Sequence, residues 1–484
     1  MNCIGNGVKV MLSQIKEKPY LLIHYAIVLF MCFVFPQLSP IGALSPKGMA
    51  LVGAFLGAVW GWSMIDMLWP SFVALFSMAW FLGANQVAAA AFGNVTVVML
   101  MFMFIAMSCI TQTGAVTWLI QKLLSLKFFM GKPWVTIGFF FYVAYFIAGF
   151  NSVIMAVILI PVLGSLFKTL KVEPYSKLST FVVMGVMYSL LMGQVTFPFM
   201  GVSLTLLMTY SAMFQSALDF ASYLLFTFPL SILMILVFMA VMKFVFRVDV
   251  SPFADMTEEA LGKCPPITKD QKKAFAIIIV LFGAMICSSI SALGPIYALI
   301  NKISLLGLSA LMLIITLLMR CEDGRPFVNV QEPTQWSIIL ITALVMVLST
   351  YMNNPEYGIV ATITQMMQPM LGMSPYVFIV CALAIAVFMT HFATNMVLCI
   401  VFMPFMVTFA ANVGMNPTGI VALLFFSCQM SLATPGGGAP LSAMFYGMDE
   451  WVKPGMMSKY AIIMILFLFA GDMIFGLLWS SIIF

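Results

Sequence analysis

The chain has 484 residues, of which 63% are hydrophobic and only 8% charged, with a formal net charge of +5. A soluble protein averages about 25% charged residues, so this composition excludes a soluble globular domain. The basic residues are scattered and do not form stripes, which argues against a nucleic-acid partner. Apolar runs recur along the whole chain and predict an all-α polytopic protein of the lipid bilayer, with about eleven transmembrane helices.

The first half begins with three predicted spans in residues 1–93, which we expect to form an N-terminal scaffold. Residues 94–247 follow as a first repeat. It holds a span, a re-entrant hairpin over 133–167 with its tip at Asn151, a span that breaks between Gly193 and Gly201, and a last span. Glycine and proline in such a run end one half-helix and start another.

Residues 248–333 are predicted to be a cytoplasmic linker followed by connecting spans. The second repeat, 334–484, holds a span, a re-entrant hairpin over 375–410, a span that breaks between Ser431 and Gly438, and the last span. The positive-inside rule places the N-terminus in the cytoplasm and the C-terminus outside. The two repeats then run in opposite senses, and short loops suggest a bacterial inner (plasma) membrane. Interrupted segments at matching places of two halves indicate a transporter binding site near the membrane midplane.

The tips and breaks carry the polar side chains that are candidates for binding. Half-helix N-termini present unpaired N–H groups and a partial positive charge, which suit an anion, while carbonyl, amide and hydroxyl oxygens suit sodium. A hydroxyl in a membrane helix also serves plain helix packing, so each single Ser or Thr has that second interpretation. The candidates are Asn151, Ser152, Thr196, Thr394, Asn395 and Thr434.

Two titratable residues lie within the predicted membrane segments. Asp472 is midway along the last span, and His391 is at the second tip. An intramembrane acid is by default a functional candidate, and histidine titrates near neutral pH. Either residue is thus a candidate for proton coupling, and the alternative for each is a hydrogen bond to a neighbouring helix. Asp66, beside Pro70, is interpreted as a helix-end residue.

Several short motifs resemble the divalent anion/sodium symporter family of the ion transporter superfamily, over nearly the whole chain. Phe92-Gly93-Asn94 is similar to the family's entry to a span, Thr394-Asn395-Met396 with Pro404 to its Ser-Asn-Thr signature, and Ala433-Thr434-Pro435 to its second break. The stretch from Trp451 to Lys459 resembles the lead-in to the last span. Phe150-Asn151-Ser152 and Met396 depart from the family pattern, so the chain looks like an atypical member.

The resemblance implies a homodimer that works as an elevator, with sodium and substrate held at both tips and both breaks. It implies a second sodium site from Thr390, Thr394, Asn395 and the carbonyl of Ala433, with Asn395 and Thr434 also on the substrate. Asn151, Ser152 and Thr196 would do equivalent work in the first half, Asn151 also for sodium.

These observations predict a secondary active transporter of small organic anions, of the di- or tricarboxylate kind, with sodium-coupled symport. Na⁺ is the expected coupling ion and no organic cofactor is expected. The alternatives are a proton-coupled anion carrier, an anion exchanger or a cation/proton antiporter of the same superfamily. An enzyme is not expected, because HExxH and Gly-x-Ser-x-Gly are absent from the sequence.

Overall fold

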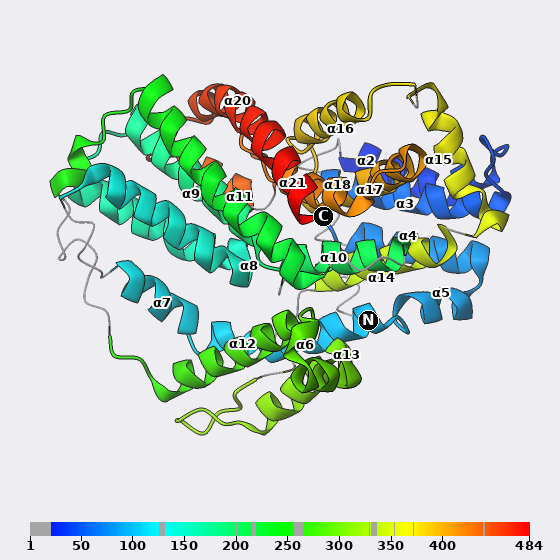
Figure 1. The fold of residues 1–484 in the computed structure, drawn as a ribbon, viewed down its shortest axis with the longest axis horizontal. Coiled ribbons are helices and arrows are strands. Elements are labelled where there is room, and N and C mark those ends of the chain that lie inside the picture. The colour runs from blue at the N-terminus through cyan, green and yellow to red at the C-terminus, as the bar shows by residue number, and fades with distance from the viewer. Residues whose placement is uncertain are drawn as a thin grey trace. The chain divides into compact units, whose positions relative to one another are not determined.

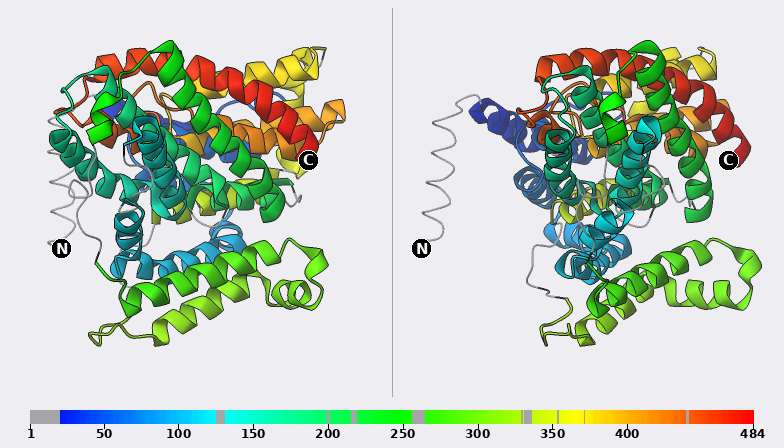
Figure 2. Two further views of the ribbon diagram at one scale, coloured as in Figure 1. Left: turned by 60° about the vertical axis from the view of Figure 1, so that its left-hand side comes forward. Right: turned by 90° about the vertical axis from the view of Figure 1, so that its left-hand side faces the viewer.

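The computed structural model is helical throughout the part of the chain that it describes, apart from loops and one isolated bridge (Figures 1 and 2). The side chains of a few helical residues, Asn151 among them, lie outside the described part. The described residues are 21–124, 131–198, 201–214, 219–255, 265–328, 330, 336–352, 354–370, 372–438 and 441–484.

The chain divides into two compact units, and the smaller one is built mainly from the N-terminal helices. It comprises Met1–Val97, Ala212–Phe214 and Gln335–Pro369. Asp66 accepts hydrogen bonds from the backbone N–H groups of Leu68 and Trp69, at 2.6 and 2.8 Å, and so caps the turn between two helices, as the sequence predicts. The main helices of this unit are α2 (Leu21–Leu29), α3 (Pro46–Met64), α4 (Trp69–Leu82), α5 (Ala84–Ala91), α14 (Trp336–Met352) and α15 (Ile359–Met367).

This division cuts across the second repeat that the sequence predicts over 334–484, because Gln335–Pro369 belong to the smaller unit and Met370–Phe484 to the larger one. Helix α14 packs against α3, α4 and α5 of the smaller unit. Most of α14 is buried in this way, from Ile339 to Ser349. Its mostly apolar sequence has no polar face to show which neighbour it would choose.

The larger unit holds both predicted hairpins, both breaks and the last span. It comprises Val98–Ser211, Gln215–Thr334 and Met370–Phe484. Its helices are α6 (Val95–Gln112), α7 (Ala115–Leu124), α8 (Pro133–Thr169), α9 (Lys177–Thr196), α10 (Gly201–Phe214), α11 (Phe220–Ala240), α12 (Lys269–Cys287), α13 (Pro295–Leu318), α16 (Pro375–Met389), α17 (Asn395–Val413), α18 (Pro417–Ser427), α19 (Leu441–Tyr446), α20 (Pro454–Gly471), η9 (Asp472–Gly476) and α21 (Leu477–Ile483).

Helix α8 has two apolar arms, Pro133–Gly149 and Met155–Thr169. The first arm runs in the same direction as its neighbour α9. The ring of Phe141 lies against Gly185 near the middle of α9, and Gly149 lies against the ring of Phe197 just after the end of α9. The first arm of α8 thus runs alongside α9 towards its C-terminal end.

The second arm of α8 returns to the beginning of α9. The Phe167 ring is 5.1 Å from the Trp451 ring, and the carbonyl of Trp451 accepts a hydrogen bond from Ser179 at 3.0 Å. A straight helix would carry Phe167 about 27 Å beyond Gly149, at 1.5 Å per residue, and away from Ser179. The chain therefore reverses direction between Gly149 and Met155, next to Asn151.

The second hairpin consists of α16 and α17, joined by a tip from Thr390 to Thr394. The rings of Phe378 and Phe409, near the open ends of the two helices, stack at 3.7 Å. The two breaks have different lengths. In the first, α9 ends at Thr196 and α10 begins at Gly201, whereas in the second α18 ends at Ser427 and α19 begins at Leu441.

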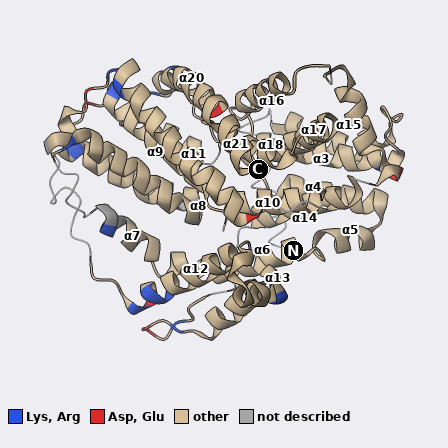
Figure 3. Cartoon of the chain, viewed as in Figure 1, with Lys and Arg blue, Asp and Glu red and all other residues tan. Residues whose placement is uncertain are grey.

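Charged residues gather at helix ends and loops, and the long helices are nearly free of them (Figure 3). Five described helices are long and apolar enough to cross a membrane, or up to seven if each of two bent pairs counts as one span. Shorter apolar helices of 10–17 residues include both arms of α8 and α4, α14 and α18. Helices of that length fit half-spans that meet inside the bilayer, because a full span needs about 20 residues.

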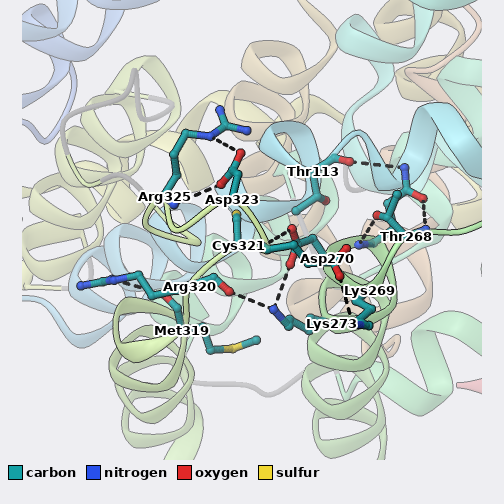
Figure 4. A network of polar contacts seen from close by, with 12 residues as sticks. Thr113, Thr268, Lys269, Asp270, Lys273, Met319, Arg320, Cys321, Asp323 and Arg325 are labelled. Carbon is teal, nitrogen blue, oxygen red and sulfur yellow. Dashed lines mark hydrogen bonds and ion pairs between the residues drawn. The ribbon is translucent and has the colours of Figure 1, made fainter.

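A network of polar contacts joins the ends of α12 and α13 (Figure 4). Lys273 donates to Asp270 at 2.9 Å and to the carbonyl of Arg320 at 2.8 Å, and the N–H of Glu322 donates to Asp270. Burial alone would raise the pKa of Asp270, but the hydrogen bonds from Lys273 and Glu322 bring it below its ordinary value. Asp270 therefore stays ionised and holds the two helix ends together at the polar boundary.

Candidate binding site between the hairpin tips

A chain of neutral polar side chains joins the two hairpins through the two broken spans. Gln194, near the end of α9, donates from Nε2 to Oε1 of Gln429 at 2.9 Å. Ser152 of the first hairpin donates to Oε1 of Gln194 at 2.6 Å, and Asn395 of the second donates from Nδ2 to Oε1 of Gln429 at 3.0 Å. We call these four residues, together with Thr390, the amide network. It brings both halves of the sequence to one place inside the larger unit.

The second tip supplies the most buried part of this network. Thr390 has no exposed surface, and its hydroxyl lies 2.7 Å from Oδ1 of Asn395 and 2.9 Å from the carbonyl oxygen of Cys428. Gln429 is also fully buried and is anchored by a hydrogen bond from Nε2 to the carbonyl of Phe425 at 3.1 Å. Buried amides need such partners, because an unpaired one costs about 1–3 kcal/mol.

Thr394 occupies the N-cap position of α17 but does not cap it. Its backbone is extended, as an N-cap requires, yet its side chain accepts no hydrogen bond from the first turn of the helix. The hydroxyl oxygen is buried and has no hydrogen-bond partner. An N-cap side chain normally accepts from the second or third N–H of its helix. Here the hydroxyl and the first N–H groups of α17 are left for a ligand, at the positive end of the helix dipole.

The second break closes over the second tip. The hydroxyl of Thr434 donates to the carbonyl of His391 and accepts from the N–H of Gly437, the latter at 3.2 Å. Ala433 lies beside it, 8% exposed, in a bend of the chain. The structure thus brings Thr390, Thr394, Asn395, Ala433 and Thr434 together around one tip.

The first tip is placed differently from what the sequence predicts. Ser152 joins the amide network, but the Asn151 side chain lies outside the described residues. Thr196 turns away from the network towards α11. Its hydroxyl lies 2.6 Å from that of Ser231 and donates to the carbonyl of Met192 at 2.8 Å, on its own helix. This hydroxyl is fully buried against α11 and is not part of the amide network, so the contact of Thr196 with the substrate stays a prediction.

The two titratable candidates lie outside the amide network. The Nδ1 atom of His391 is 2.7 Å from the carbonyl of Val387 on its own helix, and Nε2 is buried without a partner. Asp472 lies in η9, where one of its oxygens accepts a hydrogen bond from Ser427. These hydrogen bonds connect neither side chain directly to a member of the amide network.

The sequence reasoning missed the two glutamines at the centre of the network. Gln194 stands three residues before Phe197 and Gln429 two residues after Ser427, so each is at the end of the half-helix that enters a break. An amide in an otherwise apolar half-helix is costly to bury alone. Its occurrence at the matching place of both halves is the signal that could have revealed the pair.

The site is polar but uncharged. All of its described side chains are amides and hydroxyls, and among the described residues no group of three His, Cys, Asp or Glu side chains could hold a metal ion. Amide N–H groups and a helix N-terminus can bind a carboxylate, and amide, hydroxyl and carbonyl oxygens can bind sodium. A multiply charged anion would have to bring its own cations into such a site.

The fold and this site define a polytopic membrane transporter. The structure is similar to that of the YdaH transporter from Alcanivorax borkumensis, whose topology is described as unusual, with a TM-score of 0.54 and 11% sequence identity. The similarity covers 84% of this chain and 89% of that one, and at this identity it shows the fold alone.

The family is established by sequence. The profile of the citrate transporter family matches residues 55–428, and the chain belongs to that family. This agrees with the resemblance to the divalent anion/sodium symporters and makes the protein a transporter and not an enzyme. No curated protein matches the sequence.

Proposed function

We propose that this protein is a secondary carrier for citrate-like di- and tricarboxylates, which it binds at the amide network and transports together with sodium. The observation that carries the proposal is the uncharged site formed by Thr394, the free N-terminus of α17 and the amide network. The citrate transporter family supports anion transport in general.

The amide network contains a ready pair of donors for one carboxylate. The Nε2 group of Gln194 and the Nδ2 group of Asn395 both donate to a single acceptor, Oε1 of Gln429, at 2.9 and 3.0 Å. A carboxylate oxygen that replaced this acceptor would accept from the same two groups. It would also lie near Ser152 and Thr434. We therefore propose that the substrate site consists of Ser152, Gln194, Asn395, Gln429 and Thr434.

Sodium is proposed to bind at the second tip. The hydroxyls of Thr390 and Thr394, Oδ1 of Asn395 and the carbonyl of Ala433 are the oxygen ligands, and Asn151 would serve the first half. The buried hydroxyl of Thr394, which has no partner, supports this assignment. These oxygen ligands are neutral, so the bound sodium ion keeps its positive charge. That charge would offset the negative charge of the substrate in a low-dielectric site.

Transport by an elevator motion is part of the proposal. The division of the chain into two compact units, with the whole amide network in one of them, supports a carrier in which that unit moves with its cargo. We further propose a homodimer in a bacterial inner membrane, with the N-terminus in the cytoplasm and the C-terminus outside.

The test is the thermal stability of the purified protein with citrate, succinate or sulfate, each in sodium and in choline salts. A ligand that binds only the folded state stabilises it, by about 2.7 kcal/mol at 100 times its Kd. We expect a shift that requires a carboxylate and is larger in sodium, and that is lost in Asn395→Ala. Asn412→Ala is the matched control, because Asn412 is exposed at the other end of the same helix.

Two results would change the proposal. A carboxylate shift of equal size in choline would remove sodium and leave a proton-coupled carrier or an exchanger. Stabilisation by sulfate alone would remove the carboxylates as substrates.

A further inference from the structure

Asp472 is a fully buried carboxyl group within the apolar stretch Pro454–Ile483. It begins η9, a single π-helical turn between α20 and α21. Such turns are rare and frequently lie at functional sites. No part of the proposed binding of citrate and sodium uses this residue.

The carboxyl group has a single hydrogen-bond donor. Ser427 donates to Oδ2 at 2.5 Å, while Oδ1 is buried and has no partner. An ionised carboxylate offers about four acceptor sites, so one donor leaves most of its charge unsolvated. Burying a charge in that way is far more costly than burying the neutral acid. The neutral acid, with its proton, is therefore the form that this site accommodates.

The surroundings of Asp472 leave space beside the carboxyl group but provide no positively charged side chain that could neutralise it in place of a proton. A Cβ atom added at Gly476 would lie 2.7 Å from Oδ1 and 2.6 Å from Leu423 of α18, so the glycine keeps this side open. Leu230 of α11 is the next neighbour. Tyr188 of α9 is the titratable group that interacts with Asp472, and among the described residues of α9, α11, α18, α20 and α21 no charged side chain faces the carboxyl group.

Asp472 is connected to the amide network through Ser427. Ser427 is the last residue of α18, and the next two residues belong to the site. The carbonyl of Cys428 lies 2.9 Å from the hydroxyl of Thr390, and Gln429 accepts from Gln194 and Asn395. A change in the hydrogen bond between Ser427 and Asp472 therefore acts on the position of Gln429, two residues further along the chain.

We propose that Asp472 is a proton-binding site whose occupancy is coupled, through Ser427, to anion binding at the amide network. An O–H bond forms on Asp472 when the proton arrives from water, and the same bond breaks when the site is hydrated during transport. The coupling rests on the proposed function, because it needs an anion at the network, and the proton would offset part of that anion's charge. Proton binding by Asp472 itself does not depend on the anion.

The experiment is infrared difference spectroscopy of the full-length protein in lipid vesicles, between acidic and alkaline buffer. We expect a C=O band of a protonated carboxyl group that disappears at alkaline pH. The band should be lost in Asp472→Asn and retained in Asp219→Asn. Asp219 is the matched control because it caps α11 from outside the helix, and asparagine caps equally well.

Coupling is tested by repeating the pH titration of the band in the presence of citrate. We expect the band to persist to higher pH with citrate, and we expect this shift to be reduced in Ser427→Ala. A wild-type difference spectrum in Asp472→Asn would overturn the proton site. Loss of the band on adding sodium at constant pH would also overturn it, because the carboxylate would then hold a cation.

Failure of the coupling and failure of the proposed function give different results. If calorimetry shows that citrate binds while the band stays where it was, the coupling is overturned and the carrier proposal stands. If no carboxylate binds, the proposed function and the coupling fail together, and the band of Asp472 still decides the proton site.

Discussion

The two hairpin tips occupy matching places in the sequence, but they contribute different chemistry. At the second tip, Thr390, Thr394 and Asn395 gather hydroxyl and amide groups that are less than a tenth exposed. At the first tip the described polar contribution is Ser152 alone, and the Phe197 ring lies 5.4 Å from that of Tyr145. The site is therefore asymmetric. The second half supplies most of the groups that suit ions, and the first half supplies a tightly packed apolar support with the hydroxyl of Ser152 and the amide of Gln194.

The largest effect should come from the second tip. Asn395→Ala removes the donor to Gln429 and the acceptor of Thr390 at once. Each buried group that loses its partner costs about 1–3 kcal/mol, and each 1.4 kcal/mol is about tenfold in affinity. We expect uptake of labelled citrate to fall by about 100-fold or more in vesicles, while the protein still elutes as folded. Near wild-type uptake would show that the network is structural.

A methyl group added at Gly193, in the apolar support of the first half, should be poorly tolerated, whereas one added at Gly436, in the second break, should be tolerated. A Cβ atom at Gly193 would lie 2.0 Å from the carbonyl oxygen of Tyr145, which the backbone of the first hairpin holds in place, whereas at Gly436 the nearest atom is 3.5 Å away. Overpacking typically costs about 1–3 kcal/mol. We expect Gly193→Ala to lower the melting temperature clearly and Gly436→Ala to leave it nearly unchanged. Equal melting temperatures would contradict the contrast in packing between Gly193 and Gly436.

The two glutamines connect the halves, so their effects should not add. Gln194→Leu and Gln429→Leu each break the 2.9 Å contact between them, but Gln429 also accepts from Asn395. We expect Gln194→Leu, which removes a proposed carboxylate donor, to reduce citrate affinity by about tenfold or more for one buried hydrogen bond. Gln429→Leu removes the acceptor that the carboxylate would replace, so we expect it to reduce the affinity less. Residues in one network show coupling energies of about 0.5–3 kcal/mol. A double variant whose loss equals the sum of the single losses would show that the pair does not act as a unit.

Much of this architecture could be predicted from the apolar composition and from the glycine and proline residues that interrupt the helices. Half-length apolar helices around Thr390–Asn395, and the glycine and proline residues near Thr434, were enough to locate the second tip and break. The position of α14 could not be predicted, because a helix that is apolar on all sides does not specify its neighbour. The direction of a side chain around its helix is equally hidden in an apolar sequence, and Thr196 is the example. Its spacing from Asn151 says nothing about which neighbouring helix it faces.

Thr196 therefore provides the smallest and most specific test of the comparison between the halves. Thr196→Val removes a hydroxyl that lies against Ser231 of α11, outside the amide network. A buried hydroxyl pair is worth about 1 kcal/mol, so the melting temperature should fall slightly. Citrate affinity and sodium dependence should stay at the wild-type level, because the carboxylate donors, Gln194 and Asn395, are unchanged. A loss of affinity as large as in Asn395→Ala would restore Thr196 to the site and make the two tips equivalent after all.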